Sequence, residues 1–210
     1  WRFRDCTLSA NVGLSPHYSH GAAAADFDED GFDDVLITGY GGLTLYRNQG
    51  DGTFQSVTDS AGLNDQQWSS SAAWGDFNGD GALDLYVAHY VDWSATNNPR
   101  CPGPEGHERD VCPPKRFEGL PHTFYYGQSD GTFRDATADT GATTIGKGLG
   151  VVTGDLDLDG DLDIYVANDT VANLMLRNDG TGRFEDVAAL GGTTAAWPLA
   201  TRAQKAMPTI

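Results

Sequence analysis

Positive charge is scarce in this chain of 210 residues, which has 13 lysines and arginines against 30 aspartates and glutamates. The formal net charge is −17 at pH 7, and neither a basic patch nor a stripe of basic and aromatic residues interrupts the acidity. Such a surface repels phosphate backbones and anionic headgroups, which argues against nucleic acid as a partner. No run of 18 or more apolar residues occurs, so we expect no transmembrane helix and no membrane insertion.

Cysteine is rare, and its spacing fits no metal or haem motif. The three cysteines form no CxxC, CxxCH or zinc-type Cys/His pattern. The motifs G-x-S-x-G and H-E-x-x-H are also missing, and no Ser/His/Asp arrangement stands out. We therefore predict no enzymatic activity and no catalytic residues. One acidic cluster with a histidine nearby has no other assignment, and we interpret it as an exposed charged loop: Asp92, Glu105, His107, Glu108 and Asp110.

What the chain has in abundance is aspartate, arranged in three copies of the pattern D-x-[DN]-x-D-G-x-x-D at 26–34, 76–84 and 155–163. Ca²⁺ takes about six to eight oxygen ligands. Side chains at positions 1, 3, 5 and 9 and the carbonyl at position 7 can supply five, and glycine at position 6 permits the sharp turn. The sequence thus predicts three Ca²⁺ sites. Their ligands are Asp26, Asp28, Asp30, Phe32 and Asp34; Asp76, Asn78, Asp80, Ala82 and Asp84; and Asp155, Asp157, Asp159, Asp161 and Asp163. Because Asn78 replaces a carboxylate, we expect weaker binding in the second site.

An EF-hand loop would require a bidentate glutamate at position 12 and a helix on each side. Position 12 is instead Ile37, Val87 or Val166, each within a short apolar run rich in β-branched and aromatic residues. Such runs are typical of buried strands. We therefore expect each calcium loop to connect two strands, the second of which lies at 35–38, 85–88 or 164–167.

A second motif recurs in phase with the loops. It centres on a phenylalanine at positions 3, 54, 133 and 184, and the middle interval is longer by about 28 residues. Each unit is predicted to have four strands: the phenylalanine segment, a small-residue run entering the loop, the apolar run leaving it and one more. Four-stranded units repeated in series are typical of β-propeller blades. The predicted fold is an all-β propeller with blades at about 3–53, 54–132 and 133–183, and a fourth blade starting at 184.

These loops and turns resemble FG-GAP (VCBS) repeats, the calcium-loop blades of integrin α-type propellers. The segments Ala61-Gly62-Leu63 and Asp163–Asp169 make the chain most similar to secreted cartilage-acidic-protein-like propellers. The resemblance covers residues 1–192 and implies a seven-bladed propeller stabilised by calcium. It also implies a secreted, extracellular or periplasmic location, and no catalytic activity.

Two features depart from that pattern. Closed propellers have about four to eight blades, whereas three complete blades fit here, and the tail at 193–210 carries no further acidic loop. We expect the chain to be part of a longer propeller or to assemble with other copies. Since it opens at Trp1 without methionine, we expect a mature product or a fragment.

The longer middle interval indicates an insertion at about 91–121. Its cysteines, Cys101 and Cys112, lie among prolines and glycines. We predict a disulfide that restricts this loop; the alternative is a pair of free thiols in a reducing compartment. Cys6 aligns with an inward-facing strand position, so we expect a buried, inert thiol, or else a partner in a segment outside this sequence.

Polar and aromatic residues follow the strands that leave the calcium loops, and we expect them to gather on one face of the propeller. This candidate ligand face comprises His89, Tyr90, Trp93, Asn168 and Asp169; the alternative is ordinary loop polarity. The function predicted from the sequence is a secreted or cell-surface calcium-binding propeller that serves as a protein- or glycan-binding or adhesion module. The alternatives are a structural subunit of a multimeric extracellular assembly and a polysaccharide-acting enzyme.

Overall fold

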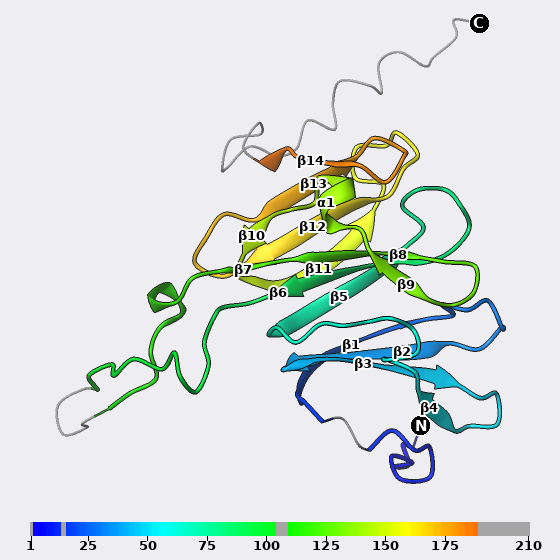
Figure 1. The fold of residues 1–210 in the computed structure, drawn as a ribbon, viewed down its shortest axis with the longest axis horizontal. Helices are drawn as coiled ribbons and strands as arrows, with labels where there is room; N and C mark the ends of the chain where they lie inside the picture. Colours follow the sequence, from blue (N-terminus) through cyan, green and yellow to red (C-terminus); the bar gives the residue numbers. More distant parts are fainter. Residues whose placement is uncertain (1, 14–15, 104–108, 189–210) are drawn as a thin grey trace, which may run out of the picture.

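A computed structural model describes residues 2–13, 16–103 and 109–188, and within them the chain forms three four-stranded antiparallel sheets (Figure 1). The first sheet contains β1 (Tyr18–Ala25), β2 (Asp34–Tyr40), β3 (Gly42–Asn48) and β4 (Phe54–Ser56). The second contains β5 (Ser69–Gly75), β6 (Asp84–His89), β8 (Thr123–Gly127) and β9 (Phe133–Asp135). The third contains β11 (Gly148–Gly154), β12 (Asp163–Asn168), β13 (Leu174–Asn178) and β14 (Phe184–Asp186).

The three sheets repeat one structural unit, and each has a register shift in its first strand. Pairing with the second strand shifts register at corresponding places, so that one residue of the first strand is skipped. The skipped residues are His20, Ser70 and Leu149. Two of them contact the next sheet or the segment that enters it: the ring of His20 stacks on Trp68, and the Ser70 hydroxyl donates to the Gly148 carbonyl at 2.6 Å.

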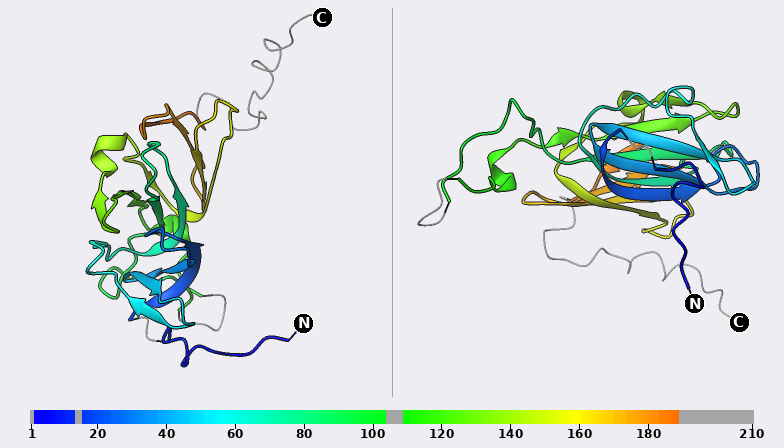
Figure 2. Two further views of the ribbon diagram at one scale, coloured as in Figure 1. Left: turned by 90° about the vertical axis from the view of Figure 1, so that its right-hand side faces the viewer. Right: turned by 90° about the horizontal axis from the view of Figure 1, so that it is seen from below.

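The sheets pack face to face like the blades of a fan, with β1, β5 and β11 next to one another (Figure 2). Strand β6 of the middle sheet is buried along its whole length. Leu85 and Val87 pack into the core shared with the first sheet, while Tyr86 and Ala88 pack into the core shared with the third. A strand covered on both faces explains why this segment is continuously apolar. This arrangement confirms the predicted β-propeller of four-stranded blades.

The blade boundaries predicted from the sequence are wrong by one strand. Phe54 pairs with Asn48, so the phenylalanine segment closes the first sheet instead of opening the second. Phe184 likewise pairs with Asn178 in β14 and completes the third sheet instead of starting a fourth. The repeat length read from the sequence is the same whichever strand is taken as the first of a blade. Only the pairing of the strands shows where each blade begins. The strands of the three sheets span 18–56, 69–135 and 148–186; the tail at 193–210 lies outside the described residues.

The insertion leaves the second sheet between β6 and β8 and projects away from the blades (Figure 1). It contains the short 3₁₀ helix η1 (Pro114–Arg116) and β7 (Leu120–Pro121), which pairs with β10 (Ile145–Gly146). The helix α1 (Thr137–Thr140) lies between β9 and β10. The predicted disulfide joins Cys101 to Cys112, whose Cα atoms are 5.3 Å apart.

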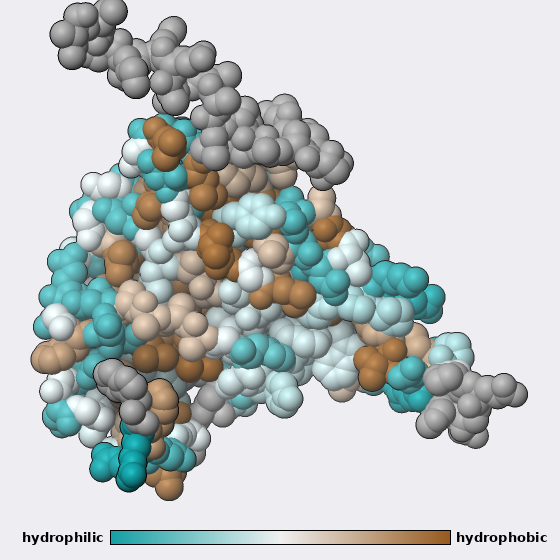
Figure 3. All heavy atoms as spheres, turned by 180° about the vertical axis from the view of Figure 1, so that it is seen from behind, coloured by the Kyte–Doolittle hydropathy of each residue, from teal (hydrophilic) through white to brown (hydrophobic). Residues whose placement is uncertain are grey.

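Cys6 is exposed, not buried as expected. The expectation assumed that the segment around Phe3 forms a strand, but residues 2–13 contain turns and no strand. No helix among the described residues is long and apolar enough to cross a membrane. Viewed from behind, the surface mixes hydrophobic patches with hydrophilic residues, and the insertion projects from one side (Figure 3).

Candidate metal centres and binding face

The three acidic loops connect the first two strands of each sheet and lie at the same end of the propeller (Figure 1). The insertion follows the far end of β6, so it lies at the opposite end. The sequence analysis predicted that the acidic loops connect strands and that other residues gather where the following strands end. In the structure, the loops and the ends of those strands lie at opposite ends of the sheets.

The backbone of each loop contains two residues in the left-handed region. The glycines at position 6 have φ of 92°, 94° and 104° at Gly31, Gly81 and Gly160. The sequence did not reveal that position 4 shares this conformation, with φ of 58° at Glu29, 73° at Gly79 and 63° at Leu158. Residue type gave no signal, because only one of these three is a glycine. The repeated pair of left-handed residues shows that the loops share one conformation.

The first aspartate of each loop closes it by accepting backbone hydrogen bonds. Asp26 accepts from the N–H groups of Asp30 at 3.0 Å and Gly31 at 2.8 Å, through different carboxylate oxygens. The same two bonds recur at Asp76 and Asp155. These bonds hold the loop in a turn around the first carboxylate.

The ninth aspartate is buried and joins the loop to the third strand of its sheet. The oxygens of Asp84 accept from the N–H groups of Phe77 and Gly127, both at 3.0 Å. Asp34 and Asp163 make the corresponding pairs of bonds. Burial raises the pKa of Asp84 to about 7, even though the two hydrogen bonds lower it. Burial likewise raises the pKa of Asp34 and of Asp163. Each is a carboxylate whose charge is costly without a cation.

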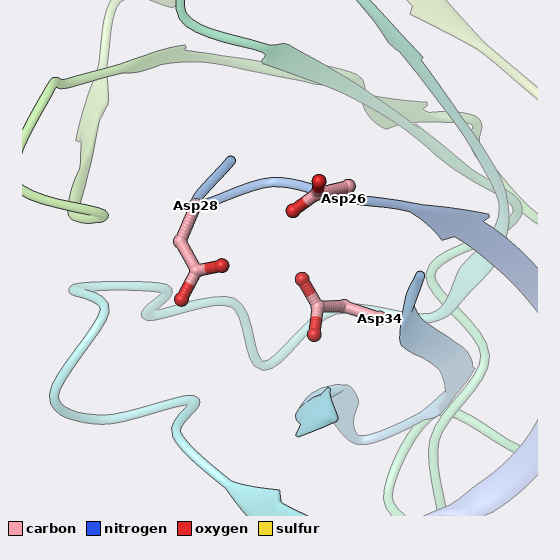
Figure 4. Close-up of side chains that lie close together, drawn as sticks. All are labelled: Asp26, Asp28 and Asp34. Carbon is pink, nitrogen blue, oxygen red and sulfur yellow. The ribbon is translucent and has the colours of Figure 1, made fainter. Parts of the chain in front are cut away.

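The third aspartate gives the strongest indication that the first and third loops fit a cation. One carboxylate oxygen, Oδ1, of Asp28 and of Asp157 is buried without a hydrogen-bond partner among the described residues. In the first loop, carboxylate oxygens of Asp26, Asp28 and Asp34 lie within 4.8 Å of one another and point toward a shared space (Figure 4). In the third loop the corresponding group is Asp155, Asp157 and Asp159. Hard oxygen donors at this density fit Ca²⁺.

The second loop differs, because its third residue is an amide. Asn78 donates from Nδ2 to Asp80 at 2.9 Å and accepts from the Asp80 N–H at 2.9 Å. Both polar atoms of the Asn78 amide are therefore hydrogen-bonded to Asp80, and its oxygen is not left without a partner as Oδ1 of Asp28 and of Asp157 is. This geometry agrees with the weaker second site expected from the sequence, which remains a prediction.

Position 7 was predicted to offer a backbone carbonyl. In each loop the N–H of this residue donates to the carboxylate at position 5, at 2.9 to 3.1 Å. The bond holds the seventh residue in place on the loop, and its carbonyl stays a predicted ligand. The residues are Phe32, Ala82 and Asp161.

An arginine that the sequence motif did not include reaches the first loop from β3. Arg47 places Nε 2.6 Å from Asp28 Oδ2 and Nη2 3.0 Å from Asp30 Oδ2. Arg177 occupies the corresponding place in the third sheet but pairs with Glu185 instead, at 2.9 Å. Of these two arginines, only Arg47 therefore contacts the carboxylates of its calcium loop.

On the opposite face, the prediction that His89 lies on a ligand-binding surface is wrong, because its side chain is fully buried. Its Nε2 lies 2.6 Å from Asp65 Oδ2, and its Nδ1 lies 2.5 Å from the carbonyl oxygen of Pro121. A carbonyl can only accept, so Nδ1 carries a proton. Burial alone would raise the pKa of Asp65, but the contacts with His89 and the hydrogen bonds from Gln67 and Ser69 together outweigh burial and lower that pKa. The lowered pKa keeps this buried carboxylate ionised beside the His89 ring.

The remaining residues of the predicted ligand face have two different roles. Asn168 is held by the backbone, accepting from the Lys147 N–H at 2.8 Å and donating to the Ala172 carbonyl at 2.7 Å. Asp169 accepts a hydrogen bond of 2.7 Å from the Tyr90 hydroxyl. Tyr90 and Trp93 line a cavity of about 670 Å³ beneath the insertion. The structure brings this pair together, as predicted.

The sequence did not point to Trp68, which also lines the cavity. Its ring contacts His20, Tyr40, Tyr90 and Trp93, with centroid distances of 5.3 to 5.9 Å. Trp68 lies just before β5, in a segment that carries no repeated motif, so periodicity could not single it out.

The comparison with family models agrees with this architecture. A family model described as FG-GAP-like repeat matches residues 16–87, 121–166 and 155–203. Among solved structures, the chain is similar to a lectin of Agrocybe aegerita described as recognising non-reducing terminal N-acetylglucosamine, at 17% identity and a TM-score of 0.26. The match covers 83% of this chain and 53% of the lectin, so the chain spans about half of that structure's length. No curated protein matches the chain. Because the repeat model covers well over half of the sequence, the chain belongs to the FG-GAP-like repeat proteins.

Proposed function

We propose that this chain is a secreted or cell-surface β-propeller that binds a protein or glycan, does not act as an enzyme, and uses Ca²⁺ to hold its blades in shape. The observation that supports calcium most directly is the orphaned, buried carboxylate oxygen of Asp28 and of Asp157. A buried anionic oxygen without a partner is costly, and a cation that several such oxygens share removes the cost.

The proposed role of calcium is structural. Each ion would neutralise carboxylates that otherwise repel one another and would fix the turn between the first two strands of a blade. Extracellular calcium modules bind with dissociation constants of about 10⁻⁴–10⁻³ M, which suits a secreted protein. The Cys101–Cys112 disulfide supports an oxidising compartment.

The proposed binding surface lies at the other end of the blades, where the insertion forms its cavity. Long ordered loops on a rigid scaffold are common sites of recognition. Because the calcium loops and the cavity occupy opposite ends, we propose that calcium supports the scaffold and does not touch the ligand.

A structural role in a multimeric assembly is the second candidate, and one observation favours it. Leu149 is the skipped residue of the third sheet, and its counterparts His20 and Ser70 contact the next sheet or its entry segment. Leu149 and Val152 on the same strand are instead more than half exposed. This face could receive another blade or another copy. Light scattering tests it: a mass above that of one chain supports assembly, and a monomer counts against it.

Thermal melts in excess calcium and in excess chelator test the calcium proposal. We expect a clear rise in melting temperature with calcium, because a ligand that binds only the folded state stabilises it. The variants Asp28→Asn and Asp157→Asn should each reduce this rise. Asp51→Asn, at an exposed turn aspartate outside the loops, is the matched control and should leave it unchanged. No calcium-dependent shift in the unmodified protein would sink the proposal.

A further inference from the structure

The cavity beneath the insertion has about 670 Å³, within the range of roughly 300–1,000 Å³ typical of small-ligand sites. Four aromatic side chains line it: Trp68, Tyr90, Trp93 and Phe117. We propose that this cavity binds a neutral sugar unit of a glycan. The proposal rests on the proposed function as a binding module and assigns it a site and a ligand class.

The aromatic wall is held in place before any ligand arrives. Trp68 packs edge to face against Tyr90, with centroids 5.3 Å apart, and against Trp93, with centroids 5.9 Å apart. The Trp68 indole N–H donates to His20 Nε2 at 2.8 Å, and the Tyr90 hydroxyl donates to Asp169 at 2.7 Å. The polar ends of both rings are therefore occupied within the protein. What these two rings offer a ligand is their apolar surface, fixed in orientation, which lowers the entropic cost of binding.

The edge of the cavity is polar and offers both kinds of hydrogen-bonding group. Asn98, Arg109 and Asp110 are exposed lining residues, and together they provide amide, guanidinium and carboxylate groups. A pyranose ring has the matching character. Its C–H face carries small positive partial charges that are attracted to the negative face of an aromatic ring, while its hydroxyls donate and accept at the perimeter. A purely apolar ligand would use the wall and leave the polar edge without a role.

The charge of the chain favours neutral over anionic sugars. The chain has a net charge of −17, which opposes sulfated and uronic-acid sugars approaching its surface. At the cavity itself, Arg109 and Asp110 carry opposite charges and leave no net excess to attract an ion. A neutral sugar is therefore the ligand that both the wall and the charge favour.

The outer wall is anchored at two points, as a preformed site requires. The disulfide closes the loop, and inside it the Asp110 N–H donates to the Cys101 carbonyl at 3.0 Å. Closer to the blades, the buried ammonium of Lys147 donates to the Pro114 carbonyl at 3.0 Å. Lys147 immediately precedes β11, so the insertion is tied to the third sheet as well as to the second.

The test uses the whole, oxidised protein in calcium and follows tryptophan fluorescence and calorimetry during titration. The probes are neutral oligosaccharides of glucose, galactose, mannose and fucose, and glucuronate oligosaccharides for comparison. We expect at least one neutral sugar to bind and glucuronates not to bind. Trp93→Ala should weaken binding by about tenfold or more. Asp110→Ala and Arg109→Ala change exposed side chains, so they should fold normally and still weaken binding. Phe3→Ala, at a fully exposed aromatic residue outside the cavity, should bind like the unmodified protein.

Two results would overturn the proposal. One is the absence of binding by every neutral sugar at millimolar concentration. The other is binding of an apolar dye or peptide that depends on Trp93, without any sugar binding, which would make the cavity an apolar docking site. Melting the same samples with and without calcium separates the two levels of inference. If calcium raises the melting temperature but no sugar binds, only the proposed sugar site is refuted. If calcium does not raise the melting temperature, the proposed function is refuted.

Discussion

His89 Nε2 lies 2.6 Å from Asp65 Oδ2, and both side chains are withdrawn from solvent. Asp65 belongs to the segment that links the first sheet to the second, and His89 ends β6. The other ring nitrogen of His89 donates to the carbonyl of Pro121, at the end of the insertion. The buried contact between His89 and Asp65 thus links the interblade segment, the middle blade and the insertion.

Because both side chains of this contact are buried, removing one partner should destabilise the fold. Asp65→Asn should lower the free energy of unfolding by about 1–3 kcal/mol. The buried carboxylate accepts hydrogen bonds from Gln67 and Ser69 and contacts His89 Nε2, and the amide replaces one of its accepting oxygens by a donor. Urea denaturation measures the change. Asp59→Asn, in the same segment but exposed, is the control and should cost less than about 0.5 kcal/mol. Equal effects of the two substitutions would show that the pair does not hold these segments.

Arg47 should compete with calcium in the first loop. Its guanidinium neutralises Asp28 and Asp30, so Arg47→Gln should raise calcium affinity at that site by about fivefold, the equivalent of an exposed ion pair of roughly 1 kcal/mol. Calorimetric titration with calcium measures the affinity. Arg177→Gln is the matched control, because Arg177 pairs with Glu185 and not with its loop. An unchanged or lower affinity after Arg47→Gln would contradict the account.

The raised pKa values of the ninth aspartates predict opposite pH dependences with and without calcium. An acid whose pKa is higher in the folded state than in the unfolded state binds its proton more tightly when folded. Stability in chelator should therefore fall as the pH rises from about 4 to about 7, the interval between the unfolded and folded pKa of Asp84. With calcium, which requires ionised ligands, the shift caused by the ion should grow over the same interval. Melts between pH 5 and 7.5 measure both trends, and a calcium-free protein that gains stability across this range would contradict the assignment.

The left-handed residue at position 4 gives a prediction about the backbone alone. Gly79 has φ of 73°, and a Cβ there would meet no atom within 4 Å. Gly79→Ala should therefore cost about 1–2 kcal/mol through conformation and not through a clash. Gly150→Ala is the matched control, since its Cβ would also meet open space and its φ is not in the left-handed region. Chemical denaturation compares the two, and equal stabilities would mean that the loop adjusts without strain.

Local chemistry in the sequence was enough to predict the loops, the strands beside them and the Cys101–Cys112 disulfide. Aspartate spacing and glycine at position 6 indicate the loop, and short apolar runs rich in β-branched and aromatic residues indicate the strands. These features depend on residues close together in the chain, so they can be recognised without knowing the fold.

The parts that the sequence did not predict depend on which segments meet. His89 follows the apolar run of β6, and the sequence does not show whether that strand is covered on one face or on both. Only the packing of the three sheets shows that His89 is buried. Arg47 follows a strand pattern and reaches the first loop because β3 pairs with β2. Trp68 gathers aromatic rings from separate segments, which no local pattern records.

The most direct measurement of the central claim is a calorimetric titration of decalcified protein with calcium, which counts the sites. The account predicts binding at all three loops, weaker at the loop with Asn78, and a similar weakening of one site in each of Asp28→Asn and Asp157→Asn. Asp51→Asn should bind like the unmodified protein. A titration without calcium binding, or with binding that survives both loop substitutions unchanged, would contradict the account.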